Sequence, residues 1–188
     1  MSNPIPSLDS ISLEFYRREA RHFDADHFVS KHNGVGFLVT HGPLPQDDDP
    51  MKTQAVQLPS AYETISGGTL EERAKETYPP GSVVFEIPLE QLKRKSQMNI
   101  LPVGRGANLP ITVAHGKISK FHGYFVYNSA GEFTYVDDSS TNGSEINGQK
   151  VPNSRKTPIE SGASITLAGS FTFTYYSAED LHAMLNLF

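Results

Sequence analysis

Three short groups of polar residues carry side chains that could together bind an anion. Gly104-Arg105 is followed by Ser119–His122 and then by Ser140–Gly143. The Arg side chain can donate two parallel, charge-assisted hydrogen bonds to one phosphate group. The later groups add hydroxyl donors and the amide of Asn142, which can both donate and accept. A phosphorylated side chain offers three strong acceptor oxygens, so these residue types suit such a ligand.

These groups must be positioned by the part of the chain that follows residue 81, where short β-rich runs alternate with turn residues. This spacing is typical of a β-sandwich or barrel, in which loops between strands converge at one end. Asn147-Gly148 has the sequence of a type I′ hairpin turn, because both central residues of that turn need a positive φ. The expected strands are Val83–Ile87, Asn99–Val103, Ile111–Val113, His122–Tyr127, Glu132–Asp137, Glu145–Ile146, Ile165–Leu167 and Phe171–Tyr176.

In this order and on this strand pattern, the motifs resemble the forkhead-associated (FHA) domain, a module that binds phosphothreonine peptides. The resemblance covers about residues 82–177. It includes the run Phe133-x-Tyr135-x-Asp137, which precedes the Ser140–Gly143 turn as an aromatic-x-Leu-x-Asp run does in the family. The resemblance implies a mainly β fold, with an FHA-like sandwich of two antiparallel sheets. It also implies that the chain reads phosphorylation and is not an enzyme.

The same resemblance implies a ligand contact for each of five residues. Arg105, Ser119 and Lys120 are expected to hold phosphate oxygens. Thr141 is expected to line the phosphothreonine pocket, and Asn142 to bind the peptide backbone. All five residue types are present at the matching positions.

Four further residues are expected to support the site without contacting the phosphate. Gly104 and Gly143 would allow tight turns close to the ligand. His122 would brace the Ser119 loop, and Ser140 would support its own turn. One departure from the family pattern is Asp138, which places a negative charge near the anion site. An exposed carboxylate there costs about 1 kcal/mol or less at physiological salt.

The N-terminal region has the pattern of two helices and one strand. Ser10 is expected to cap a helix over Ile11–His22, and Asp24 to begin a second short helix. Gly34 then ends the helical region, and Gly36–Val39 has the composition of a strand.

The remaining segments complete the expected domain organisation. Residues 42–60 are rich in Pro and Asp and are expected to form a loop or linker. Thr69–Tyr78 is expected to form a short helix with Thr69 as its N-cap. We therefore expect an extension over residues 1–80, with helices, one strand and the Pro/Asp-rich loop. The sandwich would occupy 81–188 and close with a helix over Ala178–Leu187. The sequence leaves open whether the extension packs against the sandwich.

Composition limits the kinds of partner and the cellular compartment that we expect for this protein. The net charge is −5, and it arises in residues 1–80, which hold seven Lys/Arg and twelve Asp/Glu. Residues 81–188 hold nine of each, so there is no broad basic surface for nucleic acid. The absence of Cys excludes disulfides and thiolate metal sites. Without a signal peptide or an apolar run that could span a bilayer, we expect a cytoplasmic protein that binds no membrane.

The sequence disfavours two other kinds of site, a hydrolase active site and a metal site. Ser119, His122 and Asp137 are the residue types of a hydrolase triad, but Ser119 lies in no G-x-S-x-G motif and no oxyanion-hole motif is evident. A metal site is disfavoured by the spacing of His22, His27 and His32, which are five residues apart. On a helix, each of them would be rotated by about 140° from the one before, so they would not share a metal-binding face. We expect no catalysis, no metal and no cofactor.

The expected function is recognition of a phosphothreonine-containing protein, such as a Ser/Thr kinase or the substrate of one. The alternative is a degenerate FHA scaffold that binds its partner independently of phosphate.

Overall fold

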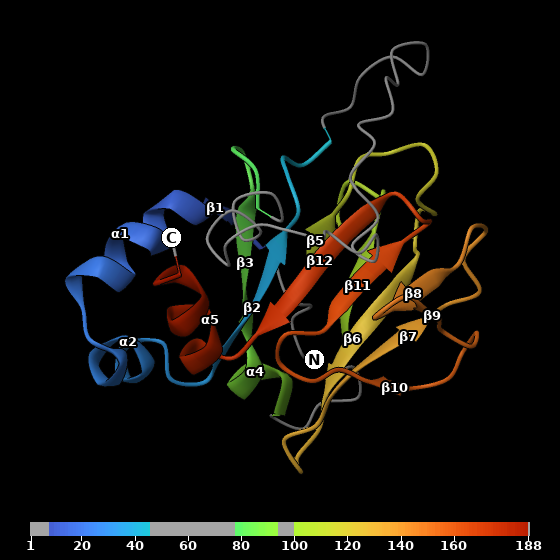
Figure 1. The fold of residues 1–188 in the computed structure, drawn as a ribbon. Helices are drawn as coiled ribbons and strands as arrows, with labels where there is room; N and C mark the ends of the chain where they lie inside the picture. The colour runs from blue at the N-terminus through green and yellow to red at the C-terminus, as the bar shows by residue number, and fades with distance from the viewer. Residues whose placement is uncertain (1–7, 46–77, 94–99, 188) are drawn as a thin grey trace.

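The computed structural model describes residues 8–45, 78–93 and 100–187. Two β-sheets pack face to face, and helices from both ends of the chain lie on the outer face of one sheet (Figure 1). This confirms the predicted mainly β sandwich with a C-terminal helix and N-terminal helices. Within these ranges, the helices are α1 (Leu13–His22), α2 (Ala25–Lys31), α4 (Leu89–Lys93) and α5 (Ala178–Leu185).

The two sheets have seven and five strands in the described part of the chain. Neighbouring strands run antiparallel except β4 and β5, which pair in parallel. In spatial order, the larger sheet contains β1 (Ser10–Ser12), β3 (Val83–Pro88), β2 (Val35–Thr40), β12 (Phe171–Tyr176), β11 (Ser164–Leu167), β8 (Ser144–Ile146) and β9 (Gln149–Lys150). The smaller sheet contains β10 (Thr157–Pro158), β7 (Phe133–Asp137), β6 (Gly123–Tyr127), β4 (Ile100–Gly104) and β5 (Ile111–Thr112).

Every expected strand is present, with ends that differ by one residue at most. The Asn147-Gly148 turn is also confirmed, because these residues have φ values of 50° and 74° and join β8 to β9. The strands that were not predicted are β1, β9 and β10. Each has only two or three residues, too few for an alternating pattern to be recognised.

The start of the first helix corrects one prediction. Ser10 does not cap it, because Ser10–Ser12 form β1 and pair with β3, with Ser10 opposite Phe85. The cap is Ser12, whose hydroxyl accepts a hydrogen bond from the Glu14 N–H at 3.3 Å. Pairing with a strand over seventy residues away therefore overrides the local helix signal. The predicted start of the second helix near Asp24 is confirmed, and the Asp24 carboxylate caps α2 by accepting from the His27 N–H at 2.9 Å.

The N-terminal segment forms part of the larger sheet, because β2 lies between β3 and β12. The two faces of β2 pack against different groups of buried residues. Leu38 joins the core between the sheets, whereas Phe37 and Val39 face the layer formed by α1, α2 and α5. A strand covered on both faces needs a nearly continuous apolar run, as found here. The N-terminal helices thus pack on the sandwich.

Two of the predicted segments fall mostly outside the described residues. The predicted helix over Thr69–Tyr78 lies outside the described residues except for its last position, as does most of the Pro/Asp-rich loop. Within the described ranges, no helix combines the length and apolar character needed to cross a membrane.

Candidate functional site

The three motif groups meet at one end of the sandwich. The Arg105 N–H, just after β4, donates to the Ser119 carbonyl at 3.0 Å. The Thr141 N–H, in the loop after β7, donates to the Ser119 hydroxyl at 3.1 Å. Ser119 therefore holds the other two loops through its backbone and side chain. Residues far apart in sequence are brought to one surface by the order of neighbouring strands β4, β6 and β7.

Gly104 allows the first two loops to approach closely. A Cβ built at this position would lie 2.5 Å from the Lys120 carbonyl oxygen and 2.8 Å from that of Ser119. Glycine is therefore needed at position 104 because neighbouring backbone atoms leave no room for a side chain. The expected reason was a tight turn. At Gly143 a positive φ of 75° does fit the expected turn.

Replacing Gly104 by Ala is expected to lower the free energy of unfolding by about 2 kcal/mol, because backbone atoms must move to admit the methyl group. Urea denaturation measures this change. Gly116→Ala is the matched control, since a Cβ there meets no atom within 4 Å. Equal stability of the two variants would contradict the crowding at Gly104.

His122 bridges two loops from a fully buried position. Its Nδ1 accepts from the Ser119 N–H at 3.2 Å, and its Nε2 lies 3.1 Å from the Gly143 carbonyl. Since a carbonyl can only accept, Nε2 carries the proton and donates. Burial lowers the pKa of His122, outweighing the opposing effects of the Gly143 carbonyl and Asp137. A neutral ring is needed here, because a protonated Nδ1 could not accept from Ser119.

The same contacts show how Ser119, His122 and Asp137, the disfavoured hydrolase triad, are used in the structure. Neither ring nitrogen of His122 bonds to the Ser119 hydroxyl, which instead accepts from Thr141. The Asp137 carboxylate lies 3.9 Å from Nε2, and the Nε2 proton goes to Gly143. The base–nucleophile hydrogen bond of a hydrolase is therefore not formed by these residues.

The folded protein is expected to lose stability as the pH falls from about 6.5 towards 4. Burial lowers the pKa of His41 from 6.5 to about 4 and also lowers that of His122. Between the folded and unfolded values, the unfolded chain binds more protons, so acid favours unfolding. Each histidine contributes a slope of about 1.4 kcal/mol per pH unit within its window.

Urea denaturation between pH 7 and 5 tests this pH dependence. The range lies above the usual pKa values of carboxylates, so the histidines dominate the change in bound protons. His41→Gln should reduce the slope, because it removes a histidine whose pKa is lowered by burial. A stability that does not change across this range would contradict the expectation.

Asp137 supports the site in a way that the sequence did not predict, because it was noted only in the Phe133–Asp137 run and in the disfavoured triad. Its fully buried carboxylate accepts from the Ser140 N–H and hydroxyl, both at 2.8 Å, and from the Ser144 hydroxyl at 2.6 Å. The Ser140 hydroxyl in turn accepts from the Gly143 N–H at 3.0 Å, which supports the structural role predicted for Ser140. An Asp followed by Ser at the third position is a turn signal that could have pointed to this anchor.

The side chains left at the surface are those predicted to contact a ligand. Arg105, Lys120, Thr141 and Asn142 are exposed, and neither basic side chain forms an ion pair with a described residue. The Asn142 amide nitrogen donates to the Lys117 carbonyl at 2.7 Å. Its amide oxygen accepts no hydrogen bond from a described residue and can therefore accept one from a ligand. The site thus presents two cations beside a hydroxyl and an amide.

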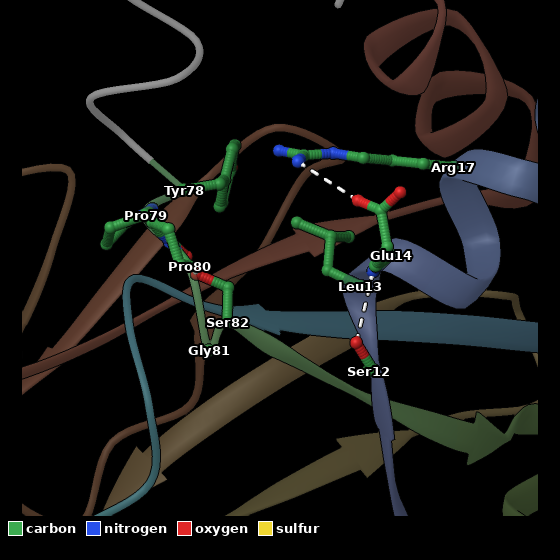
Figure 2. A pocket seen from close by; sticks show the side chains of 9 residues that line it. All are labelled: Ser12, Leu13, Glu14, Arg17, Tyr78, Pro79, Pro80, Gly81 and Ser82. Carbon is green, nitrogen blue, oxygen red and sulfur yellow. Dashed lines mark hydrogen bonds and ion pairs between the residues drawn. The ribbon is translucent and has the colours of Figure 1, made fainter.

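A separate pocket of about 240 Å³ lies away from these loops (Figure 2). It is lined by Ser12, Leu13, Glu14 and Arg17 at the start of α1, and by Tyr78–Ser82. Arg17 points across it and contacts Glu14 at 3.5 Å. None of the predicted site residues lines it.

Comparison with known proteins agrees with the motif pattern. Residues 102–168 match the family model of the FHA domain, which confirms the resemblance and includes all three motif loops. The search of curated proteins finds no match.

Similar folds occur among solved structures. The N-terminal FHA domain of Rad53p from S. cerevisiae, in complex with a phosphothreonine peptide, is 21% identical, with 50% of this chain and 81% of that chain covered and a TM-score of 0.42. The FHA domain of CT664 from Chlamydia trachomatis is 18% identical over 51% of this chain and 85% of that one, with a TM-score of 0.42. Mycobacterium tuberculosis EmbR, in complex with a low affinity phosphopeptide, is 18% identical over 44% of this chain, with a TM-score of 0.38. The match spans only 21% of the EmbR chain.

Proposed function

We propose that this chain, which carries the FHA pattern over residues 102–168, binds phosphothreonine-containing segments of partner proteins and does not catalyse a reaction. The observation that carries the proposal is the junction of three loops at Ser119. There, Arg105 and Lys120 are exposed around a hydroxyl, and the backbone beneath them is held by hydrogen bonds. A preorganised cationic surface of this kind favours a doubly charged phosphate over a neutral hydroxyl.

Each side chain has a part in the proposed complex. Arg105 donates two hydrogen bonds to the phosphate, and Lys120 adds a second positive charge. The Ser119 hydroxyl accepts from the Thr141 N–H at 3.1 Å and donates to the Thr141 hydroxyl at the long distance of 3.5 Å, so its proton can turn to a phosphate oxygen when the ligand binds. Thr141 lines the pocket. Asn142 is held by Lys117 through its nitrogen and accepts a peptide N–H through its oxygen.

The strength of such a contact suits reversible signalling. We expect micromolar affinity, which corresponds to about −8 kcal/mol. A preference for phosphothreonine over phosphoserine requires a niche for the extra methyl group. Burial of one methyl contributes about 0.8 kcal/mol, or roughly fourfold in affinity. The partner is thus a protein phosphorylated by a Ser/Thr kinase, or such a kinase itself.

Fluorescence polarisation with three matched peptide libraries tests the function. The libraries carry phosphothreonine, phosphoserine or unphosphorylated threonine at a fixed position in otherwise degenerate sequence. Binding confined to the phosphorylated sets, and strongest for phosphothreonine, is the expected result. Equal binding to the unphosphorylated set would instead favour a scaffold that recognises its partner without phosphate.

A further inference from the structure

The dipeptide Asn-Gly, a sequence with a chemistry of its own, occurs three times in the chain, at residues 33–34, 142–143 and 147–148. Asparagine is thermolabile, and a following glycine leaves the next backbone nitrogen without a side chain to shield it. That nitrogen loses its proton and attacks the side-chain amide carbon. A new C–N bond forms, ammonia leaves and a cyclic succinimide remains. Water then opens the ring, so the net reaction consumes one water and converts the neutral side chain into the carboxylate of aspartate or isoaspartate.

In the candidate site, both groups that take part in this reaction are held by hydrogen bonds. The attacking nitrogen belongs to Gly143, whose N–H donates to the Ser140 hydroxyl at 3.0 Å. The amide that would leave belongs to Asn142, and its nitrogen donates to the Lys117 carbonyl at 2.7 Å. The Ser140 hydroxyl is itself fixed, because it donates to the buried Asp137 carboxylate at 2.8 Å. Ring closure therefore requires that both hydrogen bonds break.

The dipeptide at residues 33–34, between α2 and β2, has the same sequence without this protection. Asn33 is exposed, and neither its side chain nor the Gly34 N–H forms a hydrogen bond with a described residue. Gly34 and Gly143 both have a φ of 75°, so the backbone at the two glycines is alike. The two sites therefore differ chiefly in their hydrogen bonds, which makes Asn33 an internal reference for Asn142.

The third dipeptide, in the β8–β9 turn, is intermediate between these two. The Asn147 amide oxygen accepts from the Ser164 N–H at 2.9 Å, which fixes the side chain. The Gly148 N–H donates to no described backbone carbonyl. Only one of the two reacting groups is thus held at this site.

We propose that Asn142 is a latent deamidation site, that its hydrogen bonds and those of Gly143 preserve the amide, and that its conversion to aspartate inactivates the phosphate site. The last step rests on the proposed function. A carboxylate at position 142 has no proton for the Lys117 carbonyl, and its charge competes with the phosphate for Arg105 and Lys120. Isoaspartate also adds a carbon to the backbone of the turn. Asn33 is the site that reacts first.

The protection is tested by incubating the full chain in mildly alkaline buffer and measuring deamidation at each dipeptide by peptide mapping and mass spectrometry. Asn142 should react about tenfold or more slowly than Asn33, because two hydrogen bonds must break first. In Ser140→Ala, which removes one of them, the rate at Asn142 should rise about fivefold, with the rates at Asn33 and Asn147 unchanged. Ser140→Thr keeps a hydroxyl and should keep the slow rate.

Three results would overturn the protection. The first is an equal rate at Asn142 and Asn33 in the unmodified chain, and the second is an unchanged rate at Asn142 in Ser140→Ala. The third is a rise at Asn147 in Ser140→Ala as large as the rise at Asn142, because it would show general unfolding and not the loss of one hydrogen bond.

The inactivation is tested with Asn142→Asp, which reproduces one product of the reaction. Its affinity for a phosphothreonine peptide, measured by fluorescence polarisation, should fall about tenfold or more. Asn33→Asp adds the same charge at the exposed reference site and should bind as the unmodified chain does. Retained affinity in Asn142→Asp would overturn the inactivation while leaving the proposed function established. Failure of the unmodified chain to bind would overturn the proposed function and the inactivation together, whereas the deamidation rates decide the protection independently of binding.

Discussion

Replacing Arg105 by Ala is expected to weaken binding of a phosphothreonine peptide by about 2 kcal/mol or more, roughly thirtyfold in the dissociation constant. The phosphate would be partly removed from water in the complex and would lose its bidentate partner. Lys120 cannot replace this interaction, because an ammonium lacks the planar fork. Fluorescence polarisation with the best library peptide measures the change.

The fold should survive this substitution, so the loss can be assigned to binding. The contact that Arg105 makes with Ser119 uses its backbone N–H, which alanine retains, and the side chain is exposed. Arg105→Lys should recover part of the affinity by restoring the charge. Arg18→Ala, on α1, controls for net charge. Retained affinity in Arg105→Ala would remove this residue from the phosphate site.

Replacing Asp137 by Ala is expected to lower the free energy of unfolding by about 3 kcal/mol or more. Three donors from Ser140 and Ser144 converge on this buried carboxylate. Without it, they lose their acceptor in a place that water reaches poorly, and the cost of each unsatisfied group adds to the loss. Urea denaturation with an unchanged m-value would report this effect directly.

The adjacent carboxylate provides a control within the same loop. Asp138 is exposed, so Asp138→Ala should change the free energy of unfolding by less than about 0.5 kcal/mol. The two variants also differ in their expected effect on binding. Asp137→Ala should weaken phosphopeptide binding because the Ser140–Gly143 turn loses its anchor, whereas Asp138→Ala should leave it equal or stronger. Similar stabilities for the two variants would contradict the role assigned to Asp137.

Local chemistry made much of the sandwich and the site predictable. The strands from Val83 to Tyr176, apart from β9 and β10, were recognisable because apolar alternation and turn residues lie within a few positions of one another. The three motif groups were recognisable because Gly104-Arg105, Ser119 and Asn142 keep a characteristic spacing. Their contacts with a ligand stay a prediction. Asn147-Gly148 specified its own turn for the same reason, since the required φ values are a property of those two residues.

The tertiary structure decided what depends on partners distant in sequence. Ser10–Ser12 became a strand because β3 offered it an edge, and β2 entered the larger sheet between β3 and β12. His122 proved to join two loops, and Asp137 to anchor one, because their hydrogen-bond partners come together only in the folded sandwich. Residue type and spacing thus determine which chemistry is available, whereas long-range strand pairing determines which side chains share a surface.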